Sequence, residues 1–153
     1  MIQENELRRG NYILYLNELY VVTGMKDESA VRRLRVYFQT LNGELKNAKL
    51  LNWITPIPLT PEILKNGGFK YGKVDGISSF NDSEREGDTH YWDLSIKRTD
   101  LIDSHEISIV KWGDDEYFTF QLGRGTYRQQ IKYVHQLQNL IYPLAGVELE
   151  FVW

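Results

Sequence analysis

The chain has 153 residues, which is the length of one domain or of one small domain with an elaboration. Hydrophobic residues make up 42% and charged residues 25% of the composition, which excludes an intrinsically disordered chain, collagen-like repeats and a coiled coil. The net charge of −3 argues against a whole-protein electrostatic grip on nucleic acid. The absence of cysteine excludes disulfide scaffolds, thiol catalysis and cysteine-ligated zinc or iron–sulfur sites.

The N-terminal sequence MIQENE contains neither the basic start nor the apolar core of a signal peptide. No apolar stretch in the chain approaches the roughly 20 residues that a membrane-spanning helix needs. We therefore expect a soluble protein of the cytoplasm that has no membrane partner.

Short β-rich runs dominate the first part of the chain. Residues 11–16 and 19–23 are predicted to form two strands joined by a turn at Asn17-Glu18. A third run, residues 30–38, alternates between apolar and polar side chains, which is typical of a strand with one buried face. That buried face is predicted to consist of Leu34, Val36 and Phe38.

The third run is followed by Asn42-Gly43, a pair that predicts a type I′ hairpin turn. A fourth strand is then expected to end near Trp53. Four or five short antiparallel strands within about fifty residues favour a small barrel of the SH3 type, which we assign to residues 1–55.

A short helix is expected next. Thr60 is predicted to cap a helix that has Pro61 at its first position and stops at Gly67-Gly68. Residues 70–90 are polar and rich in glycine, so we predict an exposed loop or a loose hairpin there.

The second half alternates again. Strands are predicted at residues 91–97, 106–112 and 117–122, and the glycines around Arg124 predict a turn. One helix is then predicted from the apolar spacing of Val134, Leu137, Leu140, Ile141 and Leu144. Gly146 should end this helix, and residues 147–153 read as a closing strand.

These elements predict a β-rich α+β fold, in which an N-terminal SH3-like small barrel precedes an antiparallel sheet packed on one C-terminal helix. Residues 1–55 and 56–153 form either two domains or one continuous domain. If the closing strand that ends at Trp153 lies at a sheet edge, that edge is available for pairing with a second copy of the chain, which would form a homo-oligomer.

Motifs of the common catalytic and metal sites are absent, including the GxxxxGK phosphate loop, HExxH and GxSxG. The segment Asp103-Ser104-His105-Glu106 has metal-ligand residue types, but two ligands on one strand face do not make a site. We therefore predict no metal, no cofactor and no enzymatic activity.

The segment between Arg124 and Tyr133 is the strongest candidate for ligand binding. It interleaves basic residues with tyrosines, and such side chains hold phosphate and stack on a base. The predicted ligand residues are Arg124, Tyr127, Arg128, Lys132, Tyr133, His135 and Gln138. In the alternative interpretation, this segment binds no ligand and is an amphipathic strand followed by the polar face of a helix.

A second candidate surface is the basic cluster of the third strand, Arg32, Arg33 and Arg35, because small SH3-like barrels often bind RNA or DNA. Three arginines on a net-acidic chain provide little positive charge for binding nucleic acid. Alternation also divides them between the two faces of the strand.

Three segments of the sequence, in this order, carry a resemblance to a known group. They are LRRGNYI at residues 7–13, PIPLTPEIL at 56–64 with GGF at 67–69, and IKYVHQLQNL at 131–140. These segments resemble small proteins of gut bacteria and of their phages and mobile elements, which share an LRxGN start, a PIPLT helix entry and a KYVHQLQNLY helix. The chain departs from the pattern at Ile141 and at Pro143. No established activity accompanies the resemblance, so it assigns no catalytic residue.

The resemblance implies a phage or mobile-element setting, in which proteins of this size often act by binding. We therefore expect a non-enzymatic binding protein of an accessory or counter-defence kind. It would bind a host protein or sequester a small, phosphate-containing nucleotide. The alternative is a nucleic-acid-binding module that uses the basic cluster of the barrel.

Overall fold

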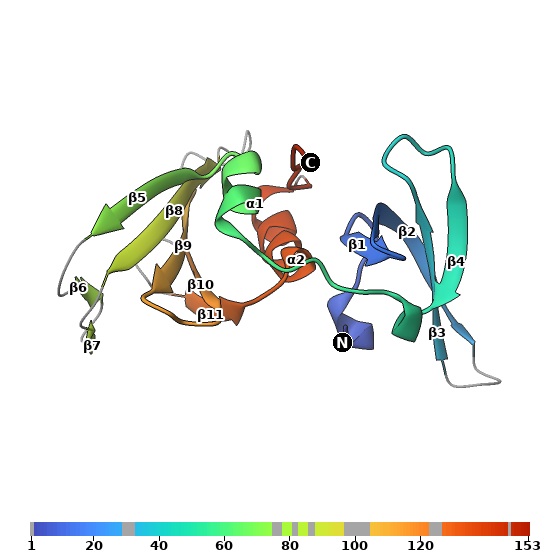
Figure 1. Cartoon of the computed structure of the whole chain (residues 1–153), viewed down its shortest axis with the longest axis horizontal. Coiled ribbons are helices and arrows are strands. Elements are labelled where there is room, and N and C mark those ends of the chain that lie inside the picture. The colour runs from blue at the N-terminus through green and yellow to red at the C-terminus, as the bar shows by residue number, and fades with distance from the viewer. Residues whose placement is uncertain are drawn as a thin grey trace. The chain divides into compact units, whose positions relative to one another are not determined.

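Figure 1 shows the computed structural model, which describes residues 2–28, 33–74, 78–80, 83–85, 88–96, 105–122, 127–146 and 148–153. The fold is β-rich α+β, as predicted, with a curled four-stranded sheet, a separate five-stranded antiparallel sheet and a C-terminal helix. The chain forms two compact units. Unit 1 comprises Met1–Pro58 and Tyr133–Ile141, and unit 2 comprises Leu59–Lys132 and Tyr142–Trp153.

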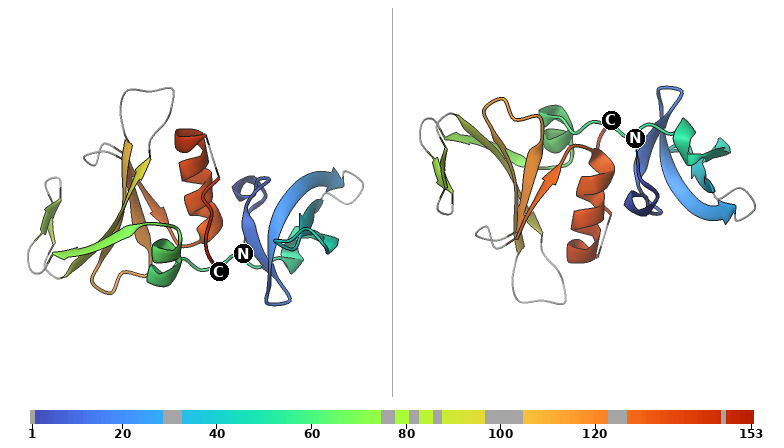
Figure 2. Two further views of the ribbon diagram at one scale, coloured as in Figure 1. Left: turned by 90° about the horizontal axis from the view of Figure 1, so that it is seen from above. Right: turned by 90° about the horizontal axis from the view of Figure 1, so that it is seen from below.

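Unit 1 contains the four-stranded antiparallel sheet, in the order β1-β2-β3-β4. Its strands are β1 (Tyr12–Tyr15), β2 (Glu18–Glu28), β3 (Arg33–Gln39) and β4 (Lys46–Leu50), and its 3₁₀ helices are η1 (Glu4–Glu6) and η2 (Leu51–Trp53). Strand β2 is long and curved (Figure 2), and its pairing with β3 shifts register between Val22 and Gly24. Such an irregularity increases the bend of a strand. Leu14 also forms an antiparallel bridge with Thr55, on the edge of β1 that does not pair with β2. The curled sheet is a half-barrel.

The core of unit 1 confirms the alternation predicted for the third strand. Val36 and Phe38 are fully buried, and Leu34 packs against the same core. The ring of Phe38 lies 5.0 Å from the ring of Tyr20 and 5.3 Å from that of Tyr15, centroid to centroid. Burial of a large apolar side chain contributes about 1.5–3 kcal/mol, so this aromatic cluster is a main source of stability for the half-barrel.

Both predicted hairpin turns differ in detail from those observed. The first lies one residue earlier than predicted, at Leu16 and Asn17, which have φ values of 52° and 64° as a type I′ turn requires. The type I′ turn predicted at Asn42-Gly43 was wrong, because only Gly43 has a positive φ, of 77°. A longer loop joins β3 to β4 there, and it is held by a hydrogen bond from the Thr40 hydroxyl to Asn42 Oδ1.

Unit 2 contains the five-stranded sheet, in the order β11-β10-β9-β8-β5. Its strands are β5 (Lys70–Val74), β8 (Thr89–Ile96), β9 (His105–Trp112), β10 (Phe118–Leu122) and β11 (Tyr127–Ile131). Strands β8, β9 and β10 were predicted, and β11 corresponds to the amphipathic strand that was the alternative interpretation of its segment, whereas β5 was not predicted. A separate hairpin of β6 (Ser78–Phe80) and β7 (Ser83–Arg85) lies within the segment for which a loop or loose hairpin was predicted.

The short helix α1 (Pro61–Asn66) begins and ends as the sequence predicted. The Thr60 hydroxyl accepts a hydrogen bond of 3.3 Å from the backbone N–H of Ile63. Gly67 is the C-cap, and Gly68 has a φ of 84°, which an L side chain rarely adopts. The chain then enters β5 directly, so α1 lies at the end of the sheet where β5 begins (Figure 2).

The long helix α2 (Val134–Ala145) ends at Gly146, which has a φ of 70°. The closing strand predicted after it was wrong. Residues 148–153 form no strand, and Phe151 is instead buried against Gly67 of the α1 C-cap. The strand edge at Trp153 that would have been available to a second copy of the chain is therefore not present. No helix in the described ranges is long and apolar enough to cross a membrane.

Candidate ligand-binding pocket

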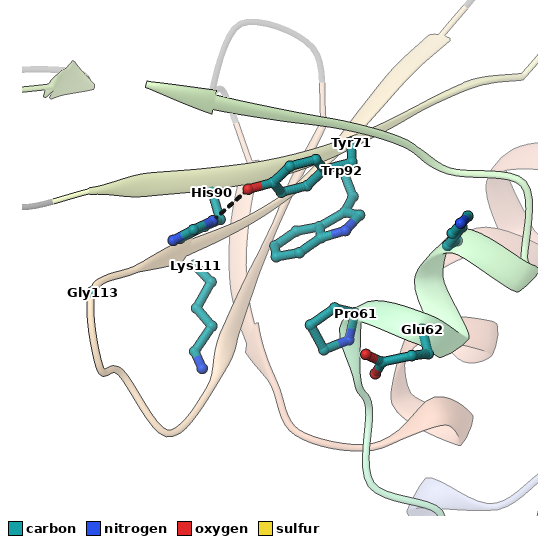
Figure 3. Close-up of a pocket in the computed structure, with 8 residues that line it drawn as sticks. Pro61, Glu62, Tyr71, His90, Trp92, Lys111 and Gly113 are labelled. Carbon is teal, nitrogen blue, oxygen red and sulfur yellow. Dashed lines mark hydrogen bonds between the residues drawn. The ribbon is translucent and has the colours of Figure 1, made fainter. Parts of the chain in front are cut away.

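A cavity of about 560 Å³ lies in unit 2 between helix α1 and one face of the sheet (Figure 3). Its size is within the range of about 300–1,000 Å³ that is usual for small-molecule sites. The lining residues are Pro61, Glu62, Lys65, Tyr71, His90, Trp92, Lys111 and Gly113.

Strand register brings four of these side chains onto one face of the sheet. Tyr71 of β5 pairs with Trp92 of β8, and His90 of β8 pairs with Lys111 of β9. Residues directly opposite each other in an antiparallel pair share a face, as do residues two apart in one strand. Three strands therefore contribute to one wall of the pocket.

The wall is aromatic. The Tyr71 ring lies 6.0 Å from the His90 ring, at an interplanar angle of 24°, and 5.5 Å from the Trp92 ring. The Tyr71 hydroxyl shares a hydrogen bond of 2.8 Å with His90 Nδ1. Trp92 is 3% exposed and Tyr71 is 56% exposed, so a buried ring supports an accessible one. This arrangement presents an aromatic surface at the mouth of the cavity.

The charges around the cavity are mixed, with an excess of positive charge. Lys65 and Lys111 outnumber the one lining carboxylate, Glu62. The Lys111 ammonium lies 5.7 Å from the ring centroid of Phe118, a cation–π distance. Among the described residues, neither lining lysine forms an ion pair. The cationic groups therefore remain available to an anion.

A neighbouring lysine on the same sheet face has a different role. Lys73 pairs with His90 in the sheet register, and its ammonium contacts the Asp88 carboxylate at 2.8 Å. The hydrogen bond from Lys73, together with its charge, lowers the pKa of Asp88 from its ordinary value. Lys73 is thus partly neutralised, which makes Lys65 and Lys111 the stronger candidates for anion contact.

The opposite wall comes from helix α1. Figure 3 shows Pro61 and Glu62 across the cavity from Trp92 and Lys111. The Thr60 cap fixes where the helix begins and so sets the position of Pro61. A slot with an aromatic wall facing a proline ring suits a planar ring system, and the lysines suit an anionic group attached to it.

The structure divides the predicted ligand residues between the two units. Arg124 lies outside the described residues. Tyr127 and Arg128 are in β11, and Lys132 follows that strand and contacts the Glu116 carboxylate at 3.3 Å. Tyr133 belongs to unit 1, where its ring stacks on that of His135 with the centroids 5.7 Å apart. A ligand role for these residues stays a prediction.

Two residues of the polar face predicted for the long helix, His135 and Gln138, are buried and not exposed. Gln138 is 0% exposed, and its side-chain amide accepts from the backbone N–H of Tyr12 and donates to the carbonyl of Gly10. His135 is also 0% exposed, and its two ring nitrogens have no hydrogen-bond partner among the described residues. Burial lowers the pKa of His135 to about 4, against a weaker opposing effect of the Glu6 carboxylate.

The basic cluster considered for nucleic acid is only partly described. Arg32 lies outside the described residues, and Arg33 is the first residue of β3. Arg35 Nε contacts Glu28 Oε1 at 2.5 Å. This hydrogen bond lowers the pKa of Glu28, and the pair reduces the positive charge available to a phosphate backbone.

The pocket residues were not predicted from the sequence. The segment His90-Tyr91-Trp92 did carry a signal, because alternation places His90 and Trp92 on one face of a strand. Tyr71 and Lys111 join them only through the pairing of distant strands. In the described part of the chain, no group of three or more His, Asp or Glu side chains could hold a metal ion.

Comparison of the chain with models of known protein families, with curated proteins and with solved structures finds no match.

Proposed function

We propose that this chain is a non-enzymatic, cytoplasmic binding protein whose ligand is a small nucleotide. The observation that carries the proposal is the pocket of unit 2, where an aromatic wall, a proline ring and two lysines surround a cavity of about 560 Å³. Every base has a π-face that can stack on an aromatic side chain, and a phosphate is the natural partner of a lysine ammonium.

Binding alone is sufficient for such a role. The resemblance to phage and mobile-element proteins suggests that the chain acts in counter-defence by sequestering a nucleotide signal, which requires affinity but no reaction. The pocket supports this reading because it offers stacking and anion contacts in one place. The net charge of −3 supports a compact ligand over a long nucleic-acid backbone.

A thermal-shift panel tests the proposal directly. The panel contains the four ribonucleoside monophosphates, cyclic mono- and dinucleotides, and ADP-ribose. A ligand at a hundred times its dissociation constant adds about 2.7 kcal/mol of stability, which corresponds to a rise in Tm of about 5–10 °C. Titration calorimetry then measures the affinity of each compound that responds. A flat response at millimolar concentrations contradicts the proposal.

Two variants assign the binding to this pocket. Tyr71→Ala should weaken binding about fivefold or more, because stacking contributes about 1–3 kcal/mol for each base. Lys111→Gln should weaken binding and reduce its dependence on salt. The matched controls are Tyr37→Ala and Lys46→Gln, exposed residues of unit 1 that should leave the affinity unchanged. Equal losses in the pocket and control variants would place binding elsewhere.

A further inference from the structure

We propose that the pocket selects ribonucleotides over 2′-deoxyribonucleotides and that Glu62 reads the sugar hydroxyls. This inference rests on the proposed function, and it adds a specificity-determining residue and a narrower ligand class to it. Glu62 is the one carboxylate among the residues that line the cavity. An ionised carboxylate accepts hydrogen bonds, so this side chain offers an acceptor to a hydrogen-bond donor on the ligand.

Glu62 lies on a different wall of the pocket from Lys111, whereas Lys65 follows it by three residues on helix α1. In Figure 3 its carboxylate lies on the α1 wall, across the cavity from Lys111 on the sheet wall. The side chain is exposed, and among the described residues its carboxylate has neither a hydrogen-bond nor an ion-pair partner. The pocket thus presents the Lys111 ammonium on the sheet wall and, on the α1 wall, an accessible carboxylate acceptor near Lys65.

A ribonucleotide matches this division of charge. Its base packs between the aromatic wall, whose exposed ring is Tyr71, and the ring of Pro61, and its phosphate lies toward Lys111. Glu62 follows Pro61 on the same α1 wall, so the sugar of a base that packs against Pro61 lies within reach of this carboxylate. An ionised carboxylate only accepts hydrogen bonds, and the neighbouring hydroxyls of ribose provide two donors. Dinucleotide-binding folds use an acidic residue on the ribose hydroxyl in the same way.

The test compares each ribonucleoside monophosphate with its 2′-deoxy counterpart by titration calorimetry on the full chain. The wild-type protein should bind the ribose form about tenfold more tightly, which corresponds to about 1.4 kcal/mol. Glu62→Ala should remove this preference by weakening the ribose form while leaving the deoxy form as tight or tighter. Glu150→Ala, the loss of an exposed carboxylate that does not line the pocket, should keep the wild-type ratio.

The outcomes separate this inference from the proposed function. Equal affinity of the ribose and deoxy forms for the wild-type protein would overturn the role of Glu62 and leave nucleotide binding intact. A preference that persists in Glu62→Ala would also overturn it, because another group would then read the sugar. No binding by either form would overturn both proposals. Circular dichroism of each variant shows that a changed affinity comes from a folded protein.

Discussion

Acidification should destabilise unit 1 through the buried side chain of His135. The imidazole is fully buried, its nitrogens have no hydrogen-bond partner in the described structure, and its pKa is lowered to about 4 from an ordinary value of 6.5. The folded chain therefore holds this histidine neutral at a pH where the unfolded chain has already protonated it. Proton uptake by the unfolded state lowers the free energy of unfolding as the pH falls through this window.

The two pKa values set the size of the effect. The contribution of His135 is fully present above pH 6.5 and is lost as the pH falls toward 4. Between pH 7 and pH 5 the linkage relation gives a loss of about 2 kcal/mol, which is a large part of the stability of a small folded unit. The Glu6 carboxylate interacts electrostatically with His135, and burial opposes the ionisation of Glu6. Hydrogen bonds from Gln3 and Gln136 outweigh burial, so its pKa is lowered and its effect appears mainly below pH 5.

Urea unfolding at pH 7 and pH 5, followed by circular dichroism, measures the loss. His135→Phe keeps a ring beside Tyr133 but cannot titrate, so its free energy of unfolding should change about 2 kcal/mol less between the two pH values than that of the wild type. His90→Phe, which replaces the partly exposed histidine of unit 2, serves as the control. The reasoning is refuted if His135→Phe loses as much stability as the wild type, or if the NMR signal of His135 titrates near pH 6.5.

Three further predictions concern stability and are measured by thermal or urea unfolding. Gln138→Ala should cost about 2 kcal/mol or more, because it removes buried hydrogen bonds to the backbone of Tyr12 and Gly10. Gly72→Ala should cost about 1–3 kcal/mol because its methyl group would collide with the Tyr91 ring, whereas Gly24→Ala, with open space around it, should be nearly neutral. Thr60→Ala should cost about 1 kcal/mol through loss of the α1 cap. An unchanged unfolding midpoint in Gln138→Ala or Gly72→Ala would contradict the packing described.

Local patterns predicted the elements whose cause is local. The alternation around Val36 depends only on which side chains face the core, and the short helix depends on Thr60, Pro61 and the glycines that follow. Strand β5 was missed because its sequence, KYGKV, is mostly exposed and contains Gly72, so it lacks an apolar rhythm. Its strand character comes from pairing with β8, which local sequence does not encode.

The pocket and the buried face of helix α2 both depend on contacts between residues that are far apart in the sequence. Trp92 and Tyr71 meet because β5 and β8 adopt one particular register, and the sequence specifies that register only through the whole sheet. Gln138 reads as a solvent-facing residue by helical spacing, yet its partners are backbone groups more than 120 residues earlier. A polar side chain that satisfies distant backbone groups is indistinguishable, in sequence, from one that faces water.

Unit 1 consists of two stretches that lie far apart in the sequence, so it can be completed only late in the synthesis of the chain. Its sheet is complete by Leu50, but the helix segment Tyr133–Ile141 that belongs to the same unit is made only after the whole five-stranded sheet of unit 2. On the ribosome, the hydrogen bonds from the Gln138 side chain to the carbonyl of Gly10 and from the N–H of Tyr12 to Gln138 therefore cannot form until the sheet of unit 2 has been synthesised. The backbone groups of residues 10 and 12 therefore acquire this native partner only after the sheet of unit 2 has been synthesised.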